Sequence, residues 1–402
     1  MAARQVDILL VGGGIAAATA AATLRAEGHE GSILLVGREP DPPYHRPPVT
    51  KEYLRGEQAR ADGFLHPEGW WDAQGVELLT RTSVTALDAA ARTATLSTKD
   101  DLAFGQALVA TGAMVRRMPV DGAQLEGVHF LRAPGNADAL RADLDGARRA
   151  VCVGGSYIGC EVAASLRELG LDVTVLLQED DPLAHHFGPA AGRRVRAVLE
   201  AHGVEVAGGE TVDRFEGEER VAAVHTVSGR RVEADVVVCG VGAIPDVMLA
   251  RRSGLELGPL GGVRCDSRLR VHGAPAVLAA GDMCEFDSVL HGRPARIEHE
   301  EVAAAQGATA ARTMLGADRP HDVVPYFFSD LSDWLSLEYA GLGGSADEEV
   351  VHGDEAGGPL AIWRLAEGRV VGLLSVDGGG DLDAARELVA RGEPVGASGL
   401  PA

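Results

Sequence analysis

Residues 6–36 read VDILLVGGGIAAATAAATLRAEGHEGSILLV, and this stretch predicts a strand, a glycine turn, a helix and a second strand. The apolar run Val6–Val11 is typical of a buried strand, and the small residues of Ala16–Ala26 are typical of a helix that ends near Gly28. Ser32–Val36 then predicts the next strand. A β–turn–α–β order of this kind indicates the first unit of a parallel sheet.

The turn inside this unit, Gly12–Ala17, has the spacing G-x-G-x-x-A. The first glycine of such a turn permits a tight bend, the second lets a pyrophosphate approach the backbone, and the last small residue lets helix and strand pack closely. The helix that follows directs unpaired N–H groups and its positive dipole end at the phosphates. Glu39, at the end of the second strand, has the position of a ribose-binding acid. These features favour a dinucleotide site over a turn that serves packing alone.

The same unit returns 142 residues later (154 − 12). Ala150–Val153 predicts a strand, Gly154–Gly159 a turn, Cys160–Leu169 a helix and Asp172–Leu177 the next strand. Ser156 stands at the middle glycine position, where a small side chain still permits close approach. Two copies at domain-scale spacing imply two related nucleotide-binding domains.

The residues after the strand of the second unit indicate which nicotinamide cofactor it would bind. Gln178–Asp181 is acidic, and no arginine stands beside it in the sequence. A 2′-phosphate placed there would meet like charges, which favours NAD over NADP.

Composition excludes several classes of protein. The 402-residue chain has 37 basic and 59 acidic residues, a formal net charge of −22, and 46% hydrophobic residues. The acidic excess argues against a nucleic-acid partner and against binding to an anionic membrane surface. The apolar run Ile8–Leu24 is shorter than the ~20 residues of a spanning helix and contains glycines, so we expect no membrane segment and a cytoplasmic protein.

The cysteines and histidines indicate neither a disulfide framework nor a metal site. The chain has five cysteines and no CxxC, so buried free thiols are expected, with Cys265 in a turn. His185 and His186 have no partner at metal-ligand spacing, so we expect solvated loop histidines and no metal.

The rest of the chain predicts further strands and a separate C-terminal part. Three apolar runs indicate buried strands: Ala107–Gly112 (ALVATG), Ala234–Pro245 (ADVVVCGVGAIP) and Ala276–Asp282 (AVLAAGD). From about Val323 aromatic residues concentrate, alternating strands follow, and Asp381–Arg391 predicts a closing helix. This part is expected to form a compact α+β domain.

The segment Pro43–Lys51 (PYHRPPVTK), together with the two glycine turns, ALVATG, GVGAIP and AAGD, closely resembles the flavoprotein ferredoxin and rubredoxin reductases. These are NADH-dependent reductases of oxygenase systems, related to apoptosis-inducing factor and more distantly to glutathione reductase. The resemblance runs from about residue 5 to at least residue 340. It implies an α/β fold with two Rossmann-like dinucleotide-binding domains, for FAD and NAD, and a small α+β C-terminal domain. The implied boundaries are 1–115 and 246–322 for the FAD domain, 116–245 for the NAD domain, and 323–402 for the C-terminal domain.

The resemblance also implies where the cofactors bind. Non-covalent FAD would contact Gly12, Gly14, Ala16, Arg38, Glu39, Arg46, Lys51, Val84, Thr111, Arg132, Asp282 and Glu300. NADH would contact Gly154, Ser156, Tyr157, Ile158, Gly159, Glu179 and Gly242. Glu161 would face the nicotinamide and pair with Lys51, which makes these two the expected catalytic residues.

Lys51 and Glu161 each have a structural alternative. Lys51 could be a surface lysine at a helix start, but the chain has only one other lysine, Lys99, among its 37 basic residues. Glu161 could be an exposed first-turn acid favoured by the helix dipole. Relatives usually have Leu-Ser at Val49-Thr50, and many have Trp where Glu300 and Phe328 stand, which bears on the choice of electron acceptor.

The resemblance implies that electrons pass from NADH through FAD to a small iron–sulfur ferredoxin of an oxygenase or P450 system. One alternative is a small-molecule reductase of quinone or monodehydroascorbate type, or an NADH oxidase. Another is an NADH-responsive redox-signalling protein like apoptosis-inducing factor. Both a monomer and a homodimer fit the sequence.

Overall fold

The computed structural model describes residues 4–344 and 346–401. The chain forms two compact units: unit 1 contains residues 4–45, 63–114 and 244–325, and unit 2 contains the remaining described residues. The chain passes between the units within β7 (Ala113–Val115) and β16 (Ala243–Pro245), among other places. In the described residues, no helix combines the length and the apolar character needed to cross a membrane.

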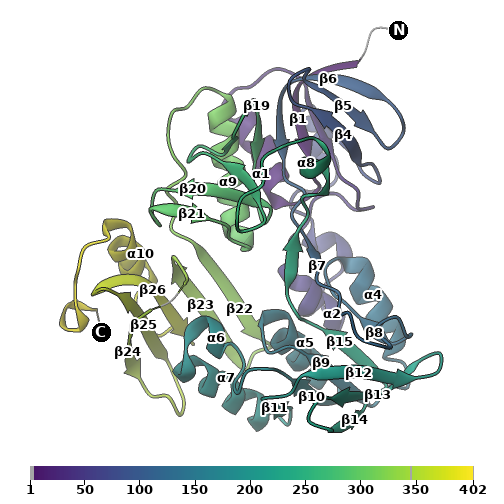
Figure 1. The fold of residues 1–402 in the computed structure, drawn as a ribbon, viewed down its shortest axis with the longest axis vertical. Coiled ribbons are helices and arrows are strands. Elements are labelled where there is room, and N and C mark those ends of the chain that lie inside the picture. The colour runs from purple at the N-terminus through teal and green to yellow at the C-terminus, as the bar shows by residue number, and fades with distance from the viewer. Residues whose placement is uncertain (1–3, 345, 402) are drawn as a thin grey trace. The chain divides into compact units, whose positions relative to one another are not determined.

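Unit 1 is built on a mixed sheet whose centre is parallel (Figure 1). Its strands are β1 (Arg4–Val11), β2 (Ile33–Val36), β3 (Val76–Leu79), β4 (Val84–Asp88), β5 (Thr93–Leu96), β6 (Asp101–Val109), β17 (Val263–Cys265), β18 (Arg270–Val271), β19 (Ala274–Ala279), β20 (Cys284–Ser288) and β21 (Arg293–Ala295). The order is β21-β20-β17-β18-β19-β6-β1-β2-β3, with β5 pairing β4 and β6. The pairs β19–β6, β6–β1, β1–β2 and β2–β3 are parallel.

The helices of unit 1 are α1 (Ile15–Ala26), α3 (Trp70–Ala73), α8 (Met248–Arg252) and α9 (Glu300–Met314). The alanine-rich α1 and α9 pack closely because both present small residues at the crossing. A Cβ at Gly307 of α9 would lie 2.1 Å from the carbonyl oxygen of Ala16, so only glycine fits there. This packing holds the start of α1 against the sheet, at the turn that follows β1.

Unit 2 contains a parallel sheet with helices and a separate antiparallel sheet. The parallel sheet has the order β11-β10-β9-β15-β8, and the antiparallel one β22-β23-β26-β25-β24. The strands are β8 (Val128–His129), β9 (Arg149–Val153), β10 (Asp172–Leu176), β11 (Glu205–Ala207), β12 (Val212–Gly217), β13 (Val221–Thr226), β14 (Arg231–Glu233), β15 (Val236–Cys239), β22 (Tyr326–Leu331), β23 (Leu335–Gly341), β24 (Glu348–Gly353), β25 (Leu360–Ala366) and β26 (Arg369–Val376). The helices are α2 (Glu52–Arg55), α4 (Pro134–Asp143), α5 (Tyr157–Glu168), α6 (Ala184–Phe187), α7 (Pro189–Ala201) and α10 (Leu382–Arg391). Short 3₁₀ turns are formed by Pro47–Thr50, Arg60–Gly63 and Ala397–Gly399.

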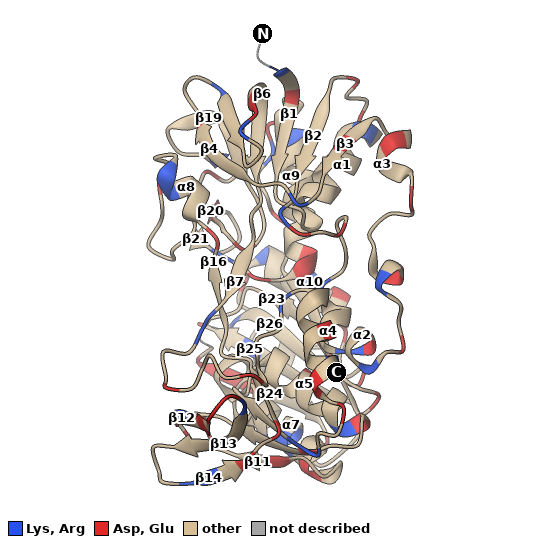
Figure 2. Ribbon diagram, turned by 90° about the vertical axis from the view of Figure 1, so that its right-hand side faces the viewer, with Lys and Arg blue, Asp and Glu red and all other residues tan. Residues whose placement is uncertain are grey.

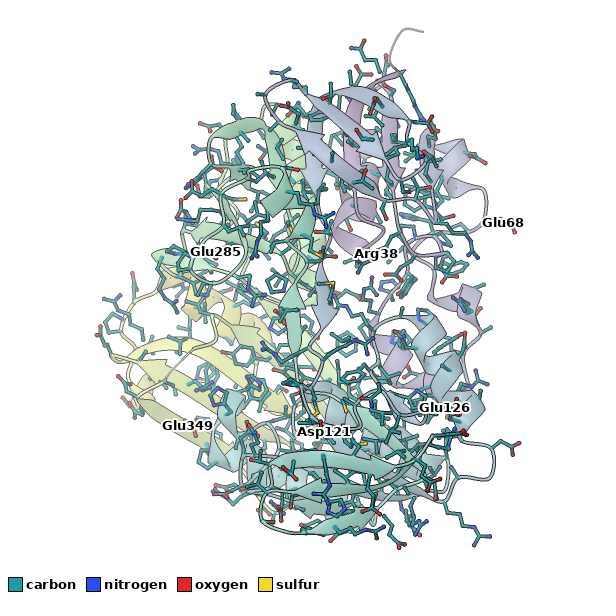
Figure 3. The ribbon with its side chains drawn as sticks, turned by 45° about the vertical axis from the view of Figure 1, so that its right-hand side comes forward. Arg38, Glu68, Asp121, Glu126, Glu285 and Glu349 are labelled. Atoms are coloured by element: carbon teal, nitrogen blue, oxygen red, sulfur yellow. The ribbon has the colours of Figure 1, made fainter. Side chains whose placement is uncertain are left out.

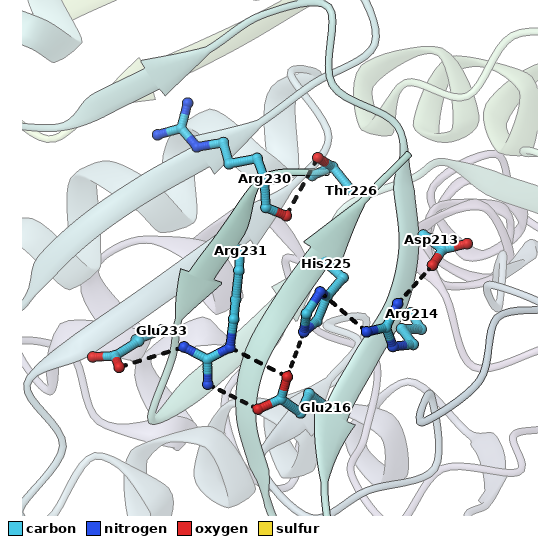
Figure 4. Close-up of polar contacts among 8 residues, drawn as sticks. All are labelled: Asp213, Arg214, Glu216, His225, Thr226, Arg230, Arg231 and Glu233. Atoms are coloured by element: carbon cyan, nitrogen blue, oxygen red, sulfur yellow. Dashed lines mark hydrogen bonds and ion pairs between the residues drawn. The ribbon is translucent and has the colours of Figure 1, made fainter. Parts of the chain in front are cut away.

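Strands β12, β13 and β14 form a small antiparallel sheet with an exposed ion network (Figure 4). Glu216 accepts hydrogen bonds from Arg231 at 2.8 Å and also bonds His225. These bonds, that of Arg231 above all, lower the pKa of the exposed Glu216 carboxyl to about 2. Figure 2 shows acidic and basic residues interspersed along the ribbon of both units.

The predicted β–turn–α–β units are both present, and the structure differs from the sequence prediction at some element ends. Helix α5 begins at Tyr157 rather than Cys160, because the extended Ser156 is its N-cap. Ala234–Pro245 is not one strand but two, β15 and β16, separated by a bend with φ +95° at Gly242. Cys265 lies in the buried strand β17 and not in a turn. A three-residue strand is too short to leave a periodic pattern in the sequence.

Candidate active site

The first glycine turn leaves open space in front of α1. Gly12 has φ +125°, and a Cβ there would lie 2.1 Å from the carbonyl oxygen of Ala110, so the position requires glycine. Gly14 is the N-cap of α1, and no side chain caps the helix there. A Cβ at Gly14 would meet no atom within 4 Å. The turn therefore combines unpaired helix N–H groups with room for an anionic group, which fits a dinucleotide pyrophosphate.

The acid expected at the ribose, Glu39, follows β2. The Tyr44 hydroxyl donates a hydrogen bond of 2.6 Å to Glu39 Oε2, which orients the carboxylate. Arg38, labelled in Figure 3, is half-exposed and donates to Asp246 Oδ2 at 2.7 Å. The Thr111 hydroxyl donates to the carbonyl oxygen of Asp246 at 2.6 Å. Arg38, Thr111 and Asp246 are thus one connected polar group in unit 1.

The other residues expected at FAD in unit 1 occupy varied places. Ala16 and Val84 are buried, Ala16 in α1 and Val84 at the start of β4. The carbonyl oxygen of Asp282 accepts a hydrogen bond of 3.0 Å from Arg296. Glu300 begins α9 and bonds His45 Nδ1 at 2.6 Å, and this hydrogen bond raises the pKa of His45.

The second glycine turn has the same strict requirements as the first. Gly154 has φ +108°, and a Cβ there would lie 2.4 Å from the carbonyl oxygen of Gly240. A Cβ at Gly159 would lie 1.9 Å from the carbonyl oxygen of Gly154. The Ser156 hydroxyl donates to the carbonyl oxygen of Gly240 at 3.1 Å, so its side chain is directed at the end of β15. Ser156 therefore fits this turn without filling the space in front of α5.

The segment after β10 is tied to this turn. The buried Leu183 has φ +60°, and its N–H donates to the carbonyl oxygen of Gly155 at 2.8 Å. His186, expected in a loop, is exposed but lies in α6, where its ring stacks on Tyr157 with centroids 5.7 Å apart. Ile158 follows Tyr157 in the first turn of α5. These contacts hold the expected NAD-binding segment beside the second glycine turn.

An arginine does lie beside the acidic segment, although it is absent from that stretch of sequence. Arg196 of α7 pairs with Asp181, and its Nη1 also donates to the carbonyl oxygen of Val206 at 2.8 Å and pairs with Glu200 at 3.1 Å. Its guanidinium is thereby engaged within the protein. Glu179 stays exposed at the carboxyl end of β10, and Gly242 is exposed after β15.

Lys51 and Glu161 form a buried ion pair in unit 2. Lys51 Nζ lies 3.2 Å from Glu161 Oε1, and the two side chains are only 4% and 8% exposed. Lys51 lies between the 3₁₀ turn Pro47–Thr50 and α2, and Glu161 lies in the second turn of α5. The alternatives of a surface lysine and an exposed first-turn acid do not describe these side chains.

Three further side chains contact the pair. The Thr50 hydroxyl donates to Glu161 Oε2 at 2.6 Å, and the Ser329 hydroxyl donates to Glu161 Oε1 at 2.7 Å. Lys51 Nζ lies 4.8 Å from the centre of the Phe328 ring, a cation–π contact. The sequence indicates a role for neither hydroxyl, because the partner of each lies far away in the chain, 111 positions from Thr50 and 168 positions from Ser329.

The expected residues Arg46 and Arg132 contact each other in unit 2. Arg46 Nη1 donates a hydrogen bond of 3.0 Å to the carbonyl oxygen of Arg132. Both residues are half-buried. Their part in binding FAD phosphates stays a prediction.

Comparison with protein families covers nearly the whole chain. The family described as pyridine nucleotide-disulphide oxidoreductase matches residues 6–307, and a family described as reductase C-terminal matches residues 326–401. The chain belongs to the pyridine nucleotide-disulphide oxidoreductase family. This membership confirms the fold class predicted from the two glycine turns.

Relatives that match this oxidoreductase over most of their own length are named as reductases. It is 35% identical over 400 residues to the ferredoxin–NAD(+) reductase component of the anthranilate 1,2-dioxygenase system of Burkholderia cepacia, covering 96% of this chain and 94% of that one. It is 33% identical over 392 residues to rhodocoxin reductase of Rhodococcus erythropolis, covering 97% and 90%. The solved covalent complex of putidaredoxin reductase and putidaredoxin contains a chain similar to this oxidoreductase with a TM-score of 0.91, 29% identity, and coverage of 98% and 95%. The resemblance carried by Pro43–Lys51 is confirmed.

Proposed function

We propose that this oxidoreductase is an NADH-dependent ferredoxin reductase that uses FAD to pass electrons to a small iron–sulfur ferredoxin of an oxygenase or P450 system. The observation that carries the proposal is the similarity along the whole chain, C-terminal segment included, to ferredoxin reductase components of such systems. One related reductase is known in a covalent complex with putidaredoxin. An acceptor of the same chemical class is therefore expected here.

The two glycine turns supply sites for the two dinucleotides. Gly12, Gly14 and the N-terminus of α1 would hold the FAD pyrophosphate, with Glu39 at a ribose. Gly154–Gly159 would hold NADH in the same way, with Glu179 at its ribose. When bound, FAD accepts a hydride from NADH and can release electrons singly, which is the chemistry that a one-electron acceptor needs.

The cysteines make a dithiol relay an unsuitable route for the electrons. No cysteine occurs in residues 37–60, where the disulfide reductases of this superfamily would carry their redox pair. All five cysteines, each in the described part of the chain, are buried free thiols. Burial raises the pKa of both Cys152 and Cys239 to about 12, so neither is a ready thiolate.

The residues we propose as catalytic are Lys51 and Glu161. A buried ammonium paired with a carboxylate places one fixed positive charge at a defined atom, Lys51 Nζ, without adding net charge to the interior. Such a charge stabilises negative charge that develops beside it during reduction.

Buried free thiols also suit a reducing compartment, so we infer that the protein works in the cytoplasm.

The proposal is tested with purified protein and candidate ferredoxins. The protein should be yellow and release about one FAD per chain on denaturation, because one glycine turn is assigned to it. NADH-driven reduction of cytochrome c should then depend on an added [2Fe–2S] ferredoxin. A colourless protein that cannot be reconstituted with FAD would overturn the proposal, and so would turnover sustained equally by quinone alone.

A further inference from the structure

The Glu161 carboxylate is held by two hydroxyl donors and one ammonium, which come from two separate parts of the chain: the segment Thr50–Lys51 and strand β22. Oε1 accepts from the Ser329 hydroxyl at 2.7 Å and lies 3.2 Å from Lys51 Nζ, while Oε2 accepts from the Thr50 hydroxyl at 2.6 Å. Both oxygens of this buried side chain are therefore occupied. A buried carboxylate whose two oxygens both accept hydrogen bonds is fixed in position.

Ser329 belongs to the C-terminal segment, in β22. Its neighbours on the buried face of the strand are Phe327 and Leu331, so the serine stands among apolar side chains and is only 1% exposed. A buried hydroxyl costs free energy unless it finds a hydrogen-bond partner. Glu161 is that partner for Ser329. Because β22 is an edge strand of its sheet, it can reach α5, beside which it runs in Figure 1.

Thr50 is fixed through its backbone as well as its hydroxyl. Its carbonyl oxygen accepts a hydrogen bond of 2.7 Å from Ser165, one turn after Glu161 on α5. Its hydroxyl also lies 3.1 Å from the carbonyl oxygen of Pro47. The residue that precedes Lys51 is thus bonded twice to the helix that carries Glu161.

We propose that Ser329 and Thr50 are positioning residues that hold Glu161 against Lys51, and that the C-terminal domain thereby contributes directly to the reactive centre. The catalytic part of this inference rests on the proposed function, whereas the contacts of Ser329 and Thr50 with Glu161 do not depend on that function. Ser329 and Thr50 would not touch the flavin or the nicotinamide. Their part is to keep the carboxylate, and through it the ammonium, at one place.

Because the chain has only two lysines, the proposed positioning of Lys51 can be tested by chemical labelling, without measuring enzyme turnover. Lys51 and Lys99 are the two lysines of the chain, and Lys99 is exposed in the turn between β5 and β6. A short pulse of acetic anhydride on the FAD-loaded protein and on the apoprotein, read by peptide mass spectrometry, gives the ratio of Lys51 to Lys99 acetylation. In Ser329→Ala the ratio should rise by about tenfold, because a hydrogen bond to a charged group contributes on this order to a local equilibrium.

Matched variants separate positioning from general loosening of the structure. Thr50→Val should raise the ratio as Ser329→Ala does, while Thr50→Ser, which keeps the hydroxyl, should return it to the wild-type value. Ser375→Ala is the control, since Ser375 is equally buried (1%) in β26 of the same sheet. An unchanged ratio in both Ser329→Ala and Thr50→Val would overturn the proposal, as would an equal rise in Ser375→Ala.

A second readout addresses catalysis. With saturating NADH, Ser329→Ala should reduce its flavin about tenfold more slowly than wild type, with an unchanged dissociation constant for NAD⁺, because only the charged pair is disturbed. A weaker NAD⁺ affinity with an unchanged limiting rate would contradict a positioning role. If the wild-type protein reduces no ferredoxin, the proposed function fails while the acetylation ratios still decide the inference.

Discussion

Lys51 Nζ and Glu161 Oε1 lie 3.2 Å apart, although 110 positions of the chain (161 − 51) separate the two residues. Both side chains are buried, so each charge is compensated by the other rather than by water. Removing one partner of a buried pair leaves an uncompensated charge, which costs about 3–5 kcal/mol. The pair is therefore expected to contribute to the stability of the protein as well as to the proposed chemistry.

The first prediction concerns Lys51→Met. The variant should retain FAD, but its flavin should be reduced by NADH one to two orders of magnitude more slowly, about 1.5–3 kcal/mol in the barrier. Lys51→Arg should not restore the rate fully, because a guanidinium is planar and wider than an ammonium. Anaerobic stopped-flow measurement of flavin bleaching gives these rates.

The control for this prediction separates charge from stability. In Lys51→Met with Glu161→Gln, the buried charge is gone, so the free energy of unfolding should recover most of its loss while reduction stays slow. Lys99→Met should match wild type in both measurements. A wild-type rate in Lys51→Met would show that the lysine is structural only.

Gly14→Ala tests the first glycine turn without disturbing the fold. A Cβ at Gly14 meets no atom of the protein within 4 Å, and the backbone there is extended, so the variant should fold normally. The methyl group would instead occupy the space of the pyrophosphate, and FAD affinity should fall by about tenfold or more. Titration of apoprotein with FAD measures this change. Gly135→Ala, where a Cβ also meets nothing, should bind FAD as wild type does; equal affinities in all three proteins would refute the assignment.

Local patterns allowed most of the nucleotide-binding framework to be predicted. Positions 12 and 154 require glycine, because each has a positive φ and a backbone carbonyl close to where a Cβ would lie. A short stretch of sequence is therefore enough to predict each glycine turn. Pro43–Lys51 identified the family for the same reason, because the motif is continuous. The pairing of Lys51 with Glu161 was available only through the resemblance.

Other contacts between distant residues could not be predicted from local sequence patterns or from the resemblance. Arg196 reaches Asp181 because α7 folds back beside the end of β10, and Ser329 reaches Glu161 because an edge strand lies beside α5. Arg196 is one of many arginines and lies in a helix, Ser329 is a serine in a strand, and neither has a motif around it in the sequence. The partner of each side chain is determined by tertiary packing, about which the local pattern of apolar residues gives no information.

Cofactor preference gives a third prediction. The kcat/KM for NADH should exceed that for NADPH by about 10- to 100-fold, or about 1–3 kcal/mol. The reason is that the 2′-phosphate of NADPH would be repelled by the exposed Glu179. The guanidinium of Arg196 would not compensate, because it already pairs with Asp181 and Glu200. Glu179→Ala should reduce this ratio. Asp172→Ala, at the opposite end of β10, should leave it unchanged. A higher kcat/KM for NADPH in the wild-type protein would contradict the prediction.

His321 predicts how stability depends on pH. Burial lowers the pKa of this imidazole from 6.5 to about 4, and the ring lies edge-on to Phe286. Below pH 6.5 the unfolded chain takes up a proton that the folded protein resists, so the free energy of unfolding should fall by about 3 kcal/mol as pH decreases to 4. Urea denaturation of wild type and His321→Gln across this range measures the difference. If the two proteins show the same pH dependence, His321 is not the group responsible.

Electron delivery to a ferredoxin is the central claim, and a single-turnover experiment tests it most directly. The protein is reduced anaerobically with one equivalent of NADH and mixed in a stopped-flow instrument with excess oxidised [2Fe–2S] ferredoxin, and flavin reoxidation is followed together with bleaching of the iron–sulfur absorbance. Two equivalents of ferredoxin should be reduced per flavin, since a hydride carries two electrons and the acceptor takes one. A flavin that stays reduced with every ferredoxin tested, yet is reoxidised at once by a quinone, would contradict the account.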